Sequence, residues 1–289
     1  MVLAYAPGAG GEDPLVAPRD WSACTGSLGE ENLSPEEAEF YDRLNKTSLK
    51  YISTSVSCVT HYDPDGSVWH SADGVKYGDL RLSSEEVGVL YMWFRFNHPQ
   101  YYFLSCAYRF NGWTLCPYLY ENMVDRKERA KITNELFDKL EGWIREVEDN
   151  AATTYQKELY ANNLICEAVT YDRESLRLYE QGIDRTGMEL CQSLYSVVIL
   201  ENTVCAGYSV AFTAIMSAMG VDATAGLSND HAWNVVRCDN GQYYCVDVCW
   251  NDKNKPDLAY RNDYFNIGDT TLQSKDADGY HIYLDYMAA

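Results

Sequence analysis

The sequence predicts an α+β protein in which a helical layer precedes an antiparallel sheet, with a smaller α+β extension on the N-terminal side. Apolar residues from about residue 132 to residue 147 recur at spacings of three and four, as on one face of a helix. Three short apolar segments with turn residues between them follow near the C-terminal end, which is typical of an antiparallel meander. Aromatic runs on both sides of Asn111-Gly112 predict a hairpin further upstream. We therefore expect a flexible leader over 1–30, the extension with this hairpin over 31–124, and the core over 125–289.

Composition limits the classes of partner. The chain has 289 residues, of which 46% are hydrophobic and 23% charged, so a sizeable core can form. With 23 Lys and Arg against 43 Asp and Glu, the formal net charge is −20. A chain this acidic repels phosphate backbones and anionic membranes, so we expect no nucleic-acid partner. No apolar run approaches the roughly 20 residues of a spanning helix, so we expect no membrane insertion.

The cysteines and the first residues limit the class of fold. The ten cysteines include no C-x-x-C pair, which argues against zinc ribbons and thioredoxin-like motifs. Their density is also too low for a disulfide-stapled miniprotein, so they do not decide the compartment. The first twenty residues carry no Lys or Arg ahead of an apolar stretch and so do not form a signal peptide. Their glycines and prolines indicate a flexible leader.

Two capping boxes mark helices in the extension. Ser34 with Glu37, and Pro35 at the first helical position, predict a helix to about Tyr51. Ser83 with Glu86 predicts a second helix to about residue 97, before Pro99 ends it. Residues 56–82 lack helical periodicity and are expected to form short strands or loop. The hairpin of aromatic strands then covers 101–120.

The core elements follow in order. A long helical pattern starts near residue 125, and 156–168 either continues it or forms a separate helix. A short helix is expected over 173–181 and a longer one over 205–219, which Gly220 ends. Strands are expected over 221–227, 231–238 and 242–250.

Three segments of the core carry groups suited to nucleophilic catalysis. Cys205 stands at the start of a predicted helix, where the helix dipole and backbone N–H groups stabilise a thiolate. His231 begins a strand, and Asp247 lies in an otherwise apolar strand. A buried carboxylate is costly unless it is paired, and a histidine on the neighbouring strand is its natural partner. Cys, His and Asp are the parts of a nucleophile, base and orienter triad.

The loop between the last two strands decides whether His231 and Asp247 share a face of the sheet. A two-residue Asn240-Gly241 turn would put them on opposite faces. A three-residue loop over 239–241, with Gly241 left-handed, would pair Trp233 with Asp247 and His231 with Cys249 on one face. A triad requires this second register, and the sequence permits both.

These segments resemble the transglutaminase-like superfamily, whose core has the papain-like cysteine protease fold. The resemblance rests on Cys205-Ala-Gly-Tyr-Ser, on His231-Ala-Trp-Asn and on Asp247-Val-Cys-Trp-Asn-Asp, and it covers roughly 160–281. That stretch also contains Tyr171-Asp172, Gln192, Tyr195, Tyr264-Phe265 and His281. One departure is Ala161-Asn162, where many members carry His-Asp.

The upstream segment from His98 to Phe103 resembles that of bacterial, often secreted members. This favours a secreted or cell-surface protein whose export signal lies outside the sequence, although the compartment stays undetermined. The resemblance implies a core in which the nucleophile helix packs on an antiparallel sheet.

The resemblance also implies an activity. Cys205 would be the nucleophile, His231 the general base and acid, and Asp247 the residue that orients the imidazole. Gln192 is a candidate side-chain donor to the oxyanion, beside the backbone N–H of Cys205. The chain is thus expected to be a cysteine-dependent acyl-transfer enzyme that attacks a protein, peptide or peptidoglycan-like amide through a thioester. Hydrolysis is favoured over transfer to an amine, because water is the default acceptor. No metal or cofactor is implied.

The same residues have other interpretations. A cysteine on an apolar helix is usually a small core residue, and a strand histidine is usually structural, but the surrounding motifs reverse this for Cys205 and His231. His61, His70, His98 and His281 are expected to be structural. A metal site or disulfide could use Cys245 and Cys249, although packing is the expected role. An alternative of another class is a non-catalytic module that binds peptide or glycan in a tyrosine-lined groove.

Overall fold

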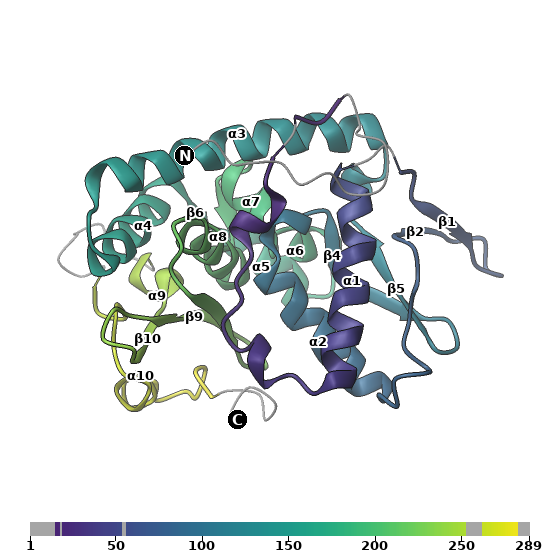
Figure 1. The fold of residues 1–289 in the computed structure, drawn as a ribbon. Coiled ribbons are helices and arrows are strands. Elements are labelled where there is room, and N and C mark those ends of the chain that lie inside the picture. The colour runs from purple at the N-terminus through teal and green to yellow at the C-terminus, as the bar shows by residue number, and fades with distance from the viewer. Residues whose placement is uncertain (1–14, 18, 54–55, 253–261, 283–289) are drawn as a thin grey trace. The chain divides into compact units, whose positions relative to one another are not determined.

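The computed structural model describes residues 15–17, 19–53, 56–252 and 262–282, and has mixed α+β architecture with antiparallel sheets (Figure 1). The chain divides into two compact units. The first contains Met1–Ser22, Leu33–Arg95 and Gln100–Asp138, and the second contains Ala23–Asn32, Phe96–Pro99 and Lys139–Ala289. No helix in the described ranges is long and apolar enough to cross a bilayer.

The first unit consists of helices and a five-stranded antiparallel sheet in which β1, β2, β5 and β3 are neighbours in that order and β4 pairs with β5. Its elements are α1 (Pro35–Ser53), β1 (Val59–Tyr62), β2 (Val68–Ser71), β3 (Val75–Lys76), α2 (Ser84–Asn97), β4 (Leu104–Phe110), β5 (Thr114–Leu119) and the start of α3 (Arg126–Asn150). Both predicted capping boxes form, as in the Ser34 N–H that donates to Glu37 Oε2 at 2.7 Å. The predicted hairpin is confirmed, with Gly112 at φ +56° in its turn.

The structure differs from the predicted flexible leader in the second half of that segment. Residues 1–14 lie outside the described residues, but short 3-10 helices cover Trp21–Cys24 and Glu30–Asn32. Trp21, Cys24 and Leu28 are buried, and the Trp21 ring packs edge-on against Phe137 at 5.1 Å. Apolar side chains therefore anchor this part of the chain, which the glycines and prolines ahead of it did not indicate.

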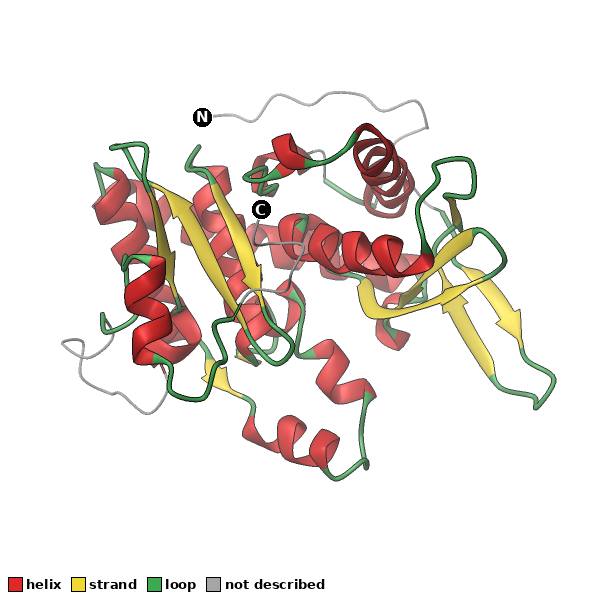
Figure 2. Ribbon diagram, turned by 90° about the horizontal axis from the view of Figure 1, so that it is seen from below, coloured by secondary structure: helices red, strands yellow, loops and turns green. Residues whose placement is uncertain are grey.

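The second unit contains the predicted helical layer and the C-terminal sheet. Its helices are the end of α3, α4 (Thr154–Ala168), α5 (Arg173–Glu180), α6 (Thr186–Leu190), α7 (Leu194–Val198), α8 (Cys205–Ala218), α9 (Val248–Asp252) and α10 (Asp269–Lys275). Its strands are β6 (Thr170–Tyr171), β7 (Asn202–Thr203), β8 (Ala223–Leu227), β9 (Ala232–Arg237) and β10 (Tyr243–Val246). α4 is separate from α3 because Thr153 and Gln156 form a third capping box. α8 packs on β8 and β9 of the antiparallel sheet β10-β9-β8 (Figure 2).

The β9–β10 connection has the three-residue loop. Tyr243 pairs with Arg237, the Cys238 N–H donates to the Gln242 carbonyl at 3.0 Å, and Gly241 has φ +76°. The expected extension of β10 to residue 250 is wrong, because the strand ends at Val246 and α9 begins at Val248. The cause is local: Asp247 Oδ1 accepts the Trp250 N–H at 2.9 Å, as an N-cap residue does. The predicted pairing of His231 with Cys249 is therefore wrong too.

Candidate active site

Cys205 is the first residue of α8, and its thiol is partly exposed. The residue before it, Val204, is extended and supplies no side-chain cap. The first N–H groups of a helix have no partner four residues earlier, so they stabilise negative charge at its start. The structure thus places the predicted nucleophile where an anion is favoured.

Close packing fixes the start of α8. A Cβ on Gly207 would collide with the Thr203 hydroxyl, so glycine lets the first helical turn approach the preceding strand β7. The Thr203 hydroxyl donates to the Cys191 carbonyl at 2.5 Å, and the Val204 N–H approaches the same carbonyl at 3.4 Å. Contacts with the preceding segment therefore fix the backbone that carries Cys205.

His231 ends the tight turn that joins β8 to β9. The Ser228 N–H donates to the His231 carbonyl at 2.9 Å, and the His231 N–H donates to Ser228 Oγ at 3.0 Å. Two residues later, the Trp233 ring fits over Gly226, where a Cβ would lie 2.5 Å from the ring. These contacts fix the backbone that carries the imidazole.

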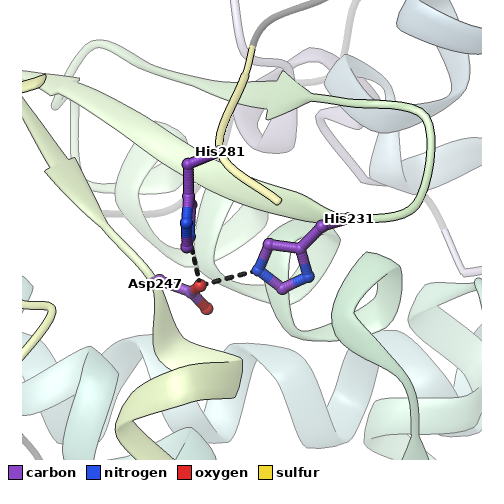
Figure 3. Close-up of side chains that lie close together, drawn as sticks. All are labelled: His231, Asp247 and His281. Carbon is purple, nitrogen blue, oxygen red and sulfur yellow. Dashed lines mark hydrogen bonds and ion pairs between the residues drawn. The ribbon is translucent and has the colours of Figure 1, made fainter. Parts of the chain in front are cut away.

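Asp247 lies at the junction of β10 and α9 and is completely buried. Its Oδ2 contacts His231 Nε2 at 2.7 Å and His281 Nε2 at 2.9 Å (Figure 3). Its Oδ1 accepts the Trp250 N–H. Three donors compensate for the cost of burying this carboxylate.

The His231–Asp247 contact shifts both pKa values in the direction of an ion pair. Burial lowers the pKa of His231, but the charge of Asp247 and the hydrogen bond to it outweigh burial and raise this pKa to about 10. Burial raises the pKa of Asp247, but the charge and hydrogen bond of His231, followed by those of His281, lower it to about 2. Each group therefore stabilises the charged form of the other.

Cys205 also acts on His231. Hydrogen bonding and charge of the Cys205 thiol follow those of Asp247 among the causes that raise the pKa of His231. Because Nε2 of His231 faces Asp247, Nδ1 is the nitrogen left for the thiol. The structure thus brings His231 and Asp247 into hydrogen-bond contact, and the Cys205 thiol lies near enough to affect the pKa of His231.

Gln192 is tied to its own segment. Its amide donates to the Met188 carbonyl at 3.4 Å, while the neighbouring Cys191 carbonyl links this segment to Val204. Its proposed contact with an oxyanion stays a prediction. Tyr171 is close to Cys205: burial first, and then the charge of Cys205, raise the pKa of its phenol.

His281, which we expected to be purely structural, is part of this network. It follows α10, is completely buried, and lies 34 positions from Asp247 in sequence. No local pattern in the sequence marks such a contact. The one available signal was that the family resemblance extends as far as His281.

The same three side chains are of the metal-ligating kind. The ligand atoms of His231, Asp247 and His281 all lie within 4.8 Å of one another. The two N···O distances are those of hydrogen bonds, and Asp247 Oδ1 is engaged by Trp250. The arrangement described is thus a hydrogen-bonded network. All ten cysteines are thiols, and Cys245 and Cys249 are buried.

The ion pair predicts how stability depends on pH. His231 has a raised pKa, so its contribution is complete below about pH 6.5 and is lost as the pH rises through about 10. Asp247 has a lowered pKa, so its contribution is complete above about pH 4 and is lost as the pH falls through about 2. We expect His231→Gln to cost the most stability between about pH 4 and 6.5, roughly 3 kcal/mol.

Urea unfolding of the native protein and the His231→Gln variant from pH 3 to pH 10 measures this difference. His61→Gln, which alters a histidine stacked on Trp69, is the control. A difference between native protein and His231→Gln that does not vary with pH would contradict the ion pair.

Comparison with known proteins identifies no family. No family model and no curated protein matches the chain. A solved structure described as a TGase (a transglutaminase) matches with a TM-score of 0.36 and 17% identity, over 52% of this chain and 44% of the solved one. The match thus spans less than half the length of that protein. It is a distant structural likeness.

Proposed function

We propose that this chain is a cysteine-dependent acyl-transfer enzyme that cleaves peptide or other amide bonds through a thioester. The observation that carries the proposal is the sequence of contacts at the site. A partly exposed cysteine at a helix start raises the pKa of an imidazole, and this imidazole contacts a buried carboxylate at 2.7 Å. A nucleophile, its base and the orienter of that base have this arrangement.

In the first half of the reaction, Cys205 sulfur attacks the amide carbonyl carbon, and the thiol proton resides on His231. The tetrahedral intermediate then collapses: the C–N bond breaks, His231 gives the proton to the leaving amine, and a thioester remains on Cys205. Backbone N–H groups at the start of α8 are suited to stabilise the oxyanion. Gln192 is the proposed side-chain donor.

In the second half, water attacks the thioester while His231 accepts its proton. The C–S bond breaks, a carboxylic acid leaves, and the thiol of Cys205 is restored. Asp247 keeps the imidazole in the orientation that both halves require. An amine that replaces water would give transfer in place of hydrolysis by the same steps.

A two-readout assay tests the proposal. Purified protein is incubated with an unstructured protein such as casein, with and without a labelled primary amine, and both fragments and incorporated label are followed. We expect fragments, because water is the default acceptor. Label without fragments would assign amine transfer instead.

The thiol reagent iodoacetamide gives a measurement that needs no substrate. Cys205 should be alkylated near neutral pH at least about tenfold faster than the other cysteines, because it is partly exposed at a helix start and interacts with His231. Cys58 is the matched comparison: its sulfur lies 3.8 Å from His70, but burial raises its pKa. Equal alkylation rates for Cys205 and Cys58, with neither fragments nor label, would favour a binding module.

A further inference from the structure

The carboxylate that orients His231 is shared with a second histidine. His281 Nε2 contacts Asp247 Oδ2 at 2.9 Å, the oxygen that also contacts His231. On its other side, His281 Nδ1 lies 3.2 Å from Asp276 Oδ2, which also accepts the His281 main-chain N–H at 2.5 Å. Imidazole and carboxylate thus alternate through His231, Asp247, His281 and Asp276, a set that we call the relay network.

We infer that His281, held by Asp276, is a positioning residue that moderates the hold of Asp247 on His231. The inference rests on the proposed function, because it concerns the base of that reaction. It adds two residues to the three that a nucleophile, base and orienter require.

Both carboxylates that face His281 are ionised. The pKa of Asp247 is about 2. For Asp276, burial raises the pKa, but the N–H groups of His281 and Tyr280 and the charge of the His281 ring lower it by more. An ionised carboxylate only accepts hydrogen bonds. The two contacts of His281 are therefore satisfied together when both of its ring nitrogens donate, as in an imidazolium.

A positive charge on His281 changes how Asp247 acts on His231. A lone buried carboxylate raises the pKa of the His231 imidazolium and so makes the return of its proton to a leaving amine less favourable. His281 shares the same oxygen and offsets part of its negative charge. Asp247 can then orient His231 with a weaker hold on its proton.

Other charged or titratable groups face the two imidazoles. In addition to Asp247, the Cys205 thiol acts on His231. The Tyr280 ring lies 6.3 Å from the His231 ring. The Tyr264 ring stacks on His281 at 6.3 Å, and Lys275 Nζ lies 5.2 Å from the Tyr264 ring centre. Trp233 and Trp250 enclose His281 edge-on at 5.0 and 4.7 Å. Among these neighbours, Asp247 and Asp276 are the groups in hydrogen-bond contact with the His281 ring.

Charge-changing variants test the role. Beyond His231, the native relay network carries −1 on Asp247, +1 on His281 and −1 on Asp276, a sum of −1. In His281→Gln the positive charge is lost and the sum becomes −2. The His231 imidazolium should then persist to higher pH. The alkaline limb of the pH profile of kcat/KM, where activity falls as His231 loses its proton, should therefore move to higher pH by about one to two units. We expect kcat to fall roughly tenfold with KM little changed, because the return of the proton is impaired.

The double variant His281→Gln with Asp276→Asn restores the sum of −1, so its alkaline limb should return toward the native position. His61→Gln is the control and should leave the limb in place. A merely structural role would lower stability and rate without moving the limb. An unmoved limb in a folded His281→Gln variant would overturn the inference.

Long-range ¹H–¹⁵N spectra of the native protein provide a test that depends on no variant and no activity. The chain has five histidines, and we expect the His281 ring to show two protonated nitrogens at neutral pH. One unprotonated nitrogen in the His281 ring would overturn the inference even if the enzyme is active. Two protonated nitrogens in a protein without activity would support the relay network while the proposed function fails. Zinc binding at one equivalent that is lost in His231→Gln, Asp247→Asn and His281→Gln alike would overturn it in favour of a metal centre.

Discussion

Replacement of Cys205 by alanine is expected to abolish amide cleavage, with a loss on the order of 10⁵–10⁶-fold in kcat, as for other removed nucleophiles. The thiol is the group that forms the thioester, and alanine offers no electron pair in its place. Stability should change by less than about 1 kcal/mol, because the side chain is small and partly exposed. Active-site titration and fragment release, with urea unfolding in parallel, measure the two effects.

Cys58→Ala is the matched control. Cys58 is also half-buried and also lies beside a histidine, His70, at 3.8 Å. It should retain native activity, because its cysteine–histidine pair is not part of the candidate site. Full activity in Cys205→Ala would remove the nucleophile from the proposal.

Replacement of Asp247 by asparagine is expected to lower kcat by roughly 10²–10⁴-fold, less than the loss of Cys205. Asparagine can still cap α9 through its side-chain oxygen, but it carries no charge to stabilise the His231 imidazolium. Asp247→Ala should lose the same activity and, in addition, about 1 kcal/mol from the lost cap. Steady-state kinetics and thermal unfolding of both variants separate the orienting role from the capping role.

Asp172→Asn controls for the loss of a buried capping carboxylate. Asp172 accepts the Ser175 N–H at 2.9 Å as N-cap of α5, and the Cys191 thiol contacts it at 3.2 Å. It should cost less stability than Asp247→Asn, because Asp172 caps a helix without an imidazole partner, and activity should be largely kept. If Asp247→Asn kept native kcat across the pH range, His231 would need no orienter and the triad would be wrong.

Elements with short-range causes were predicted well from the sequence. Both capping boxes place side chain and backbone within three residues of each other, so α1 and α2 begin where Ser34 and Ser83 predict. The register of β9 and β10 was different, because Asn240-Gly241 suits both a two-residue turn and a three-residue loop. The structure has the three-residue loop with Gly241 left-handed, and this is the register that lets the side chains of His231 and Asp247 meet.

After β10 the chain could either continue as a strand or begin a helix, and the sequence does not decide between the two. Val246, Val248 and Cys249 form an apolar run that is typical of a strand, but Asp247 can also cap a helix. Burial of its carboxylate favours the cap, because the Trp250 N–H then satisfies Oδ1 while the two histidines satisfy Oδ2.

The relay network was decided by tertiary structure alone. His281 and Asp276 meet Asp247 only because the chain returns after α10 to the end of β10, and no periodicity or spacing records such a return. Local sequence specifies hydrogen bonds that close within a few residues, and it specified Cys205, His231 and Asp247 through their surrounding motifs. The partners of a buried charge are the distant donors that the folded chain brings within about 3 Å of it. The contact of His281 with Asp247 therefore became apparent only in the folded structure.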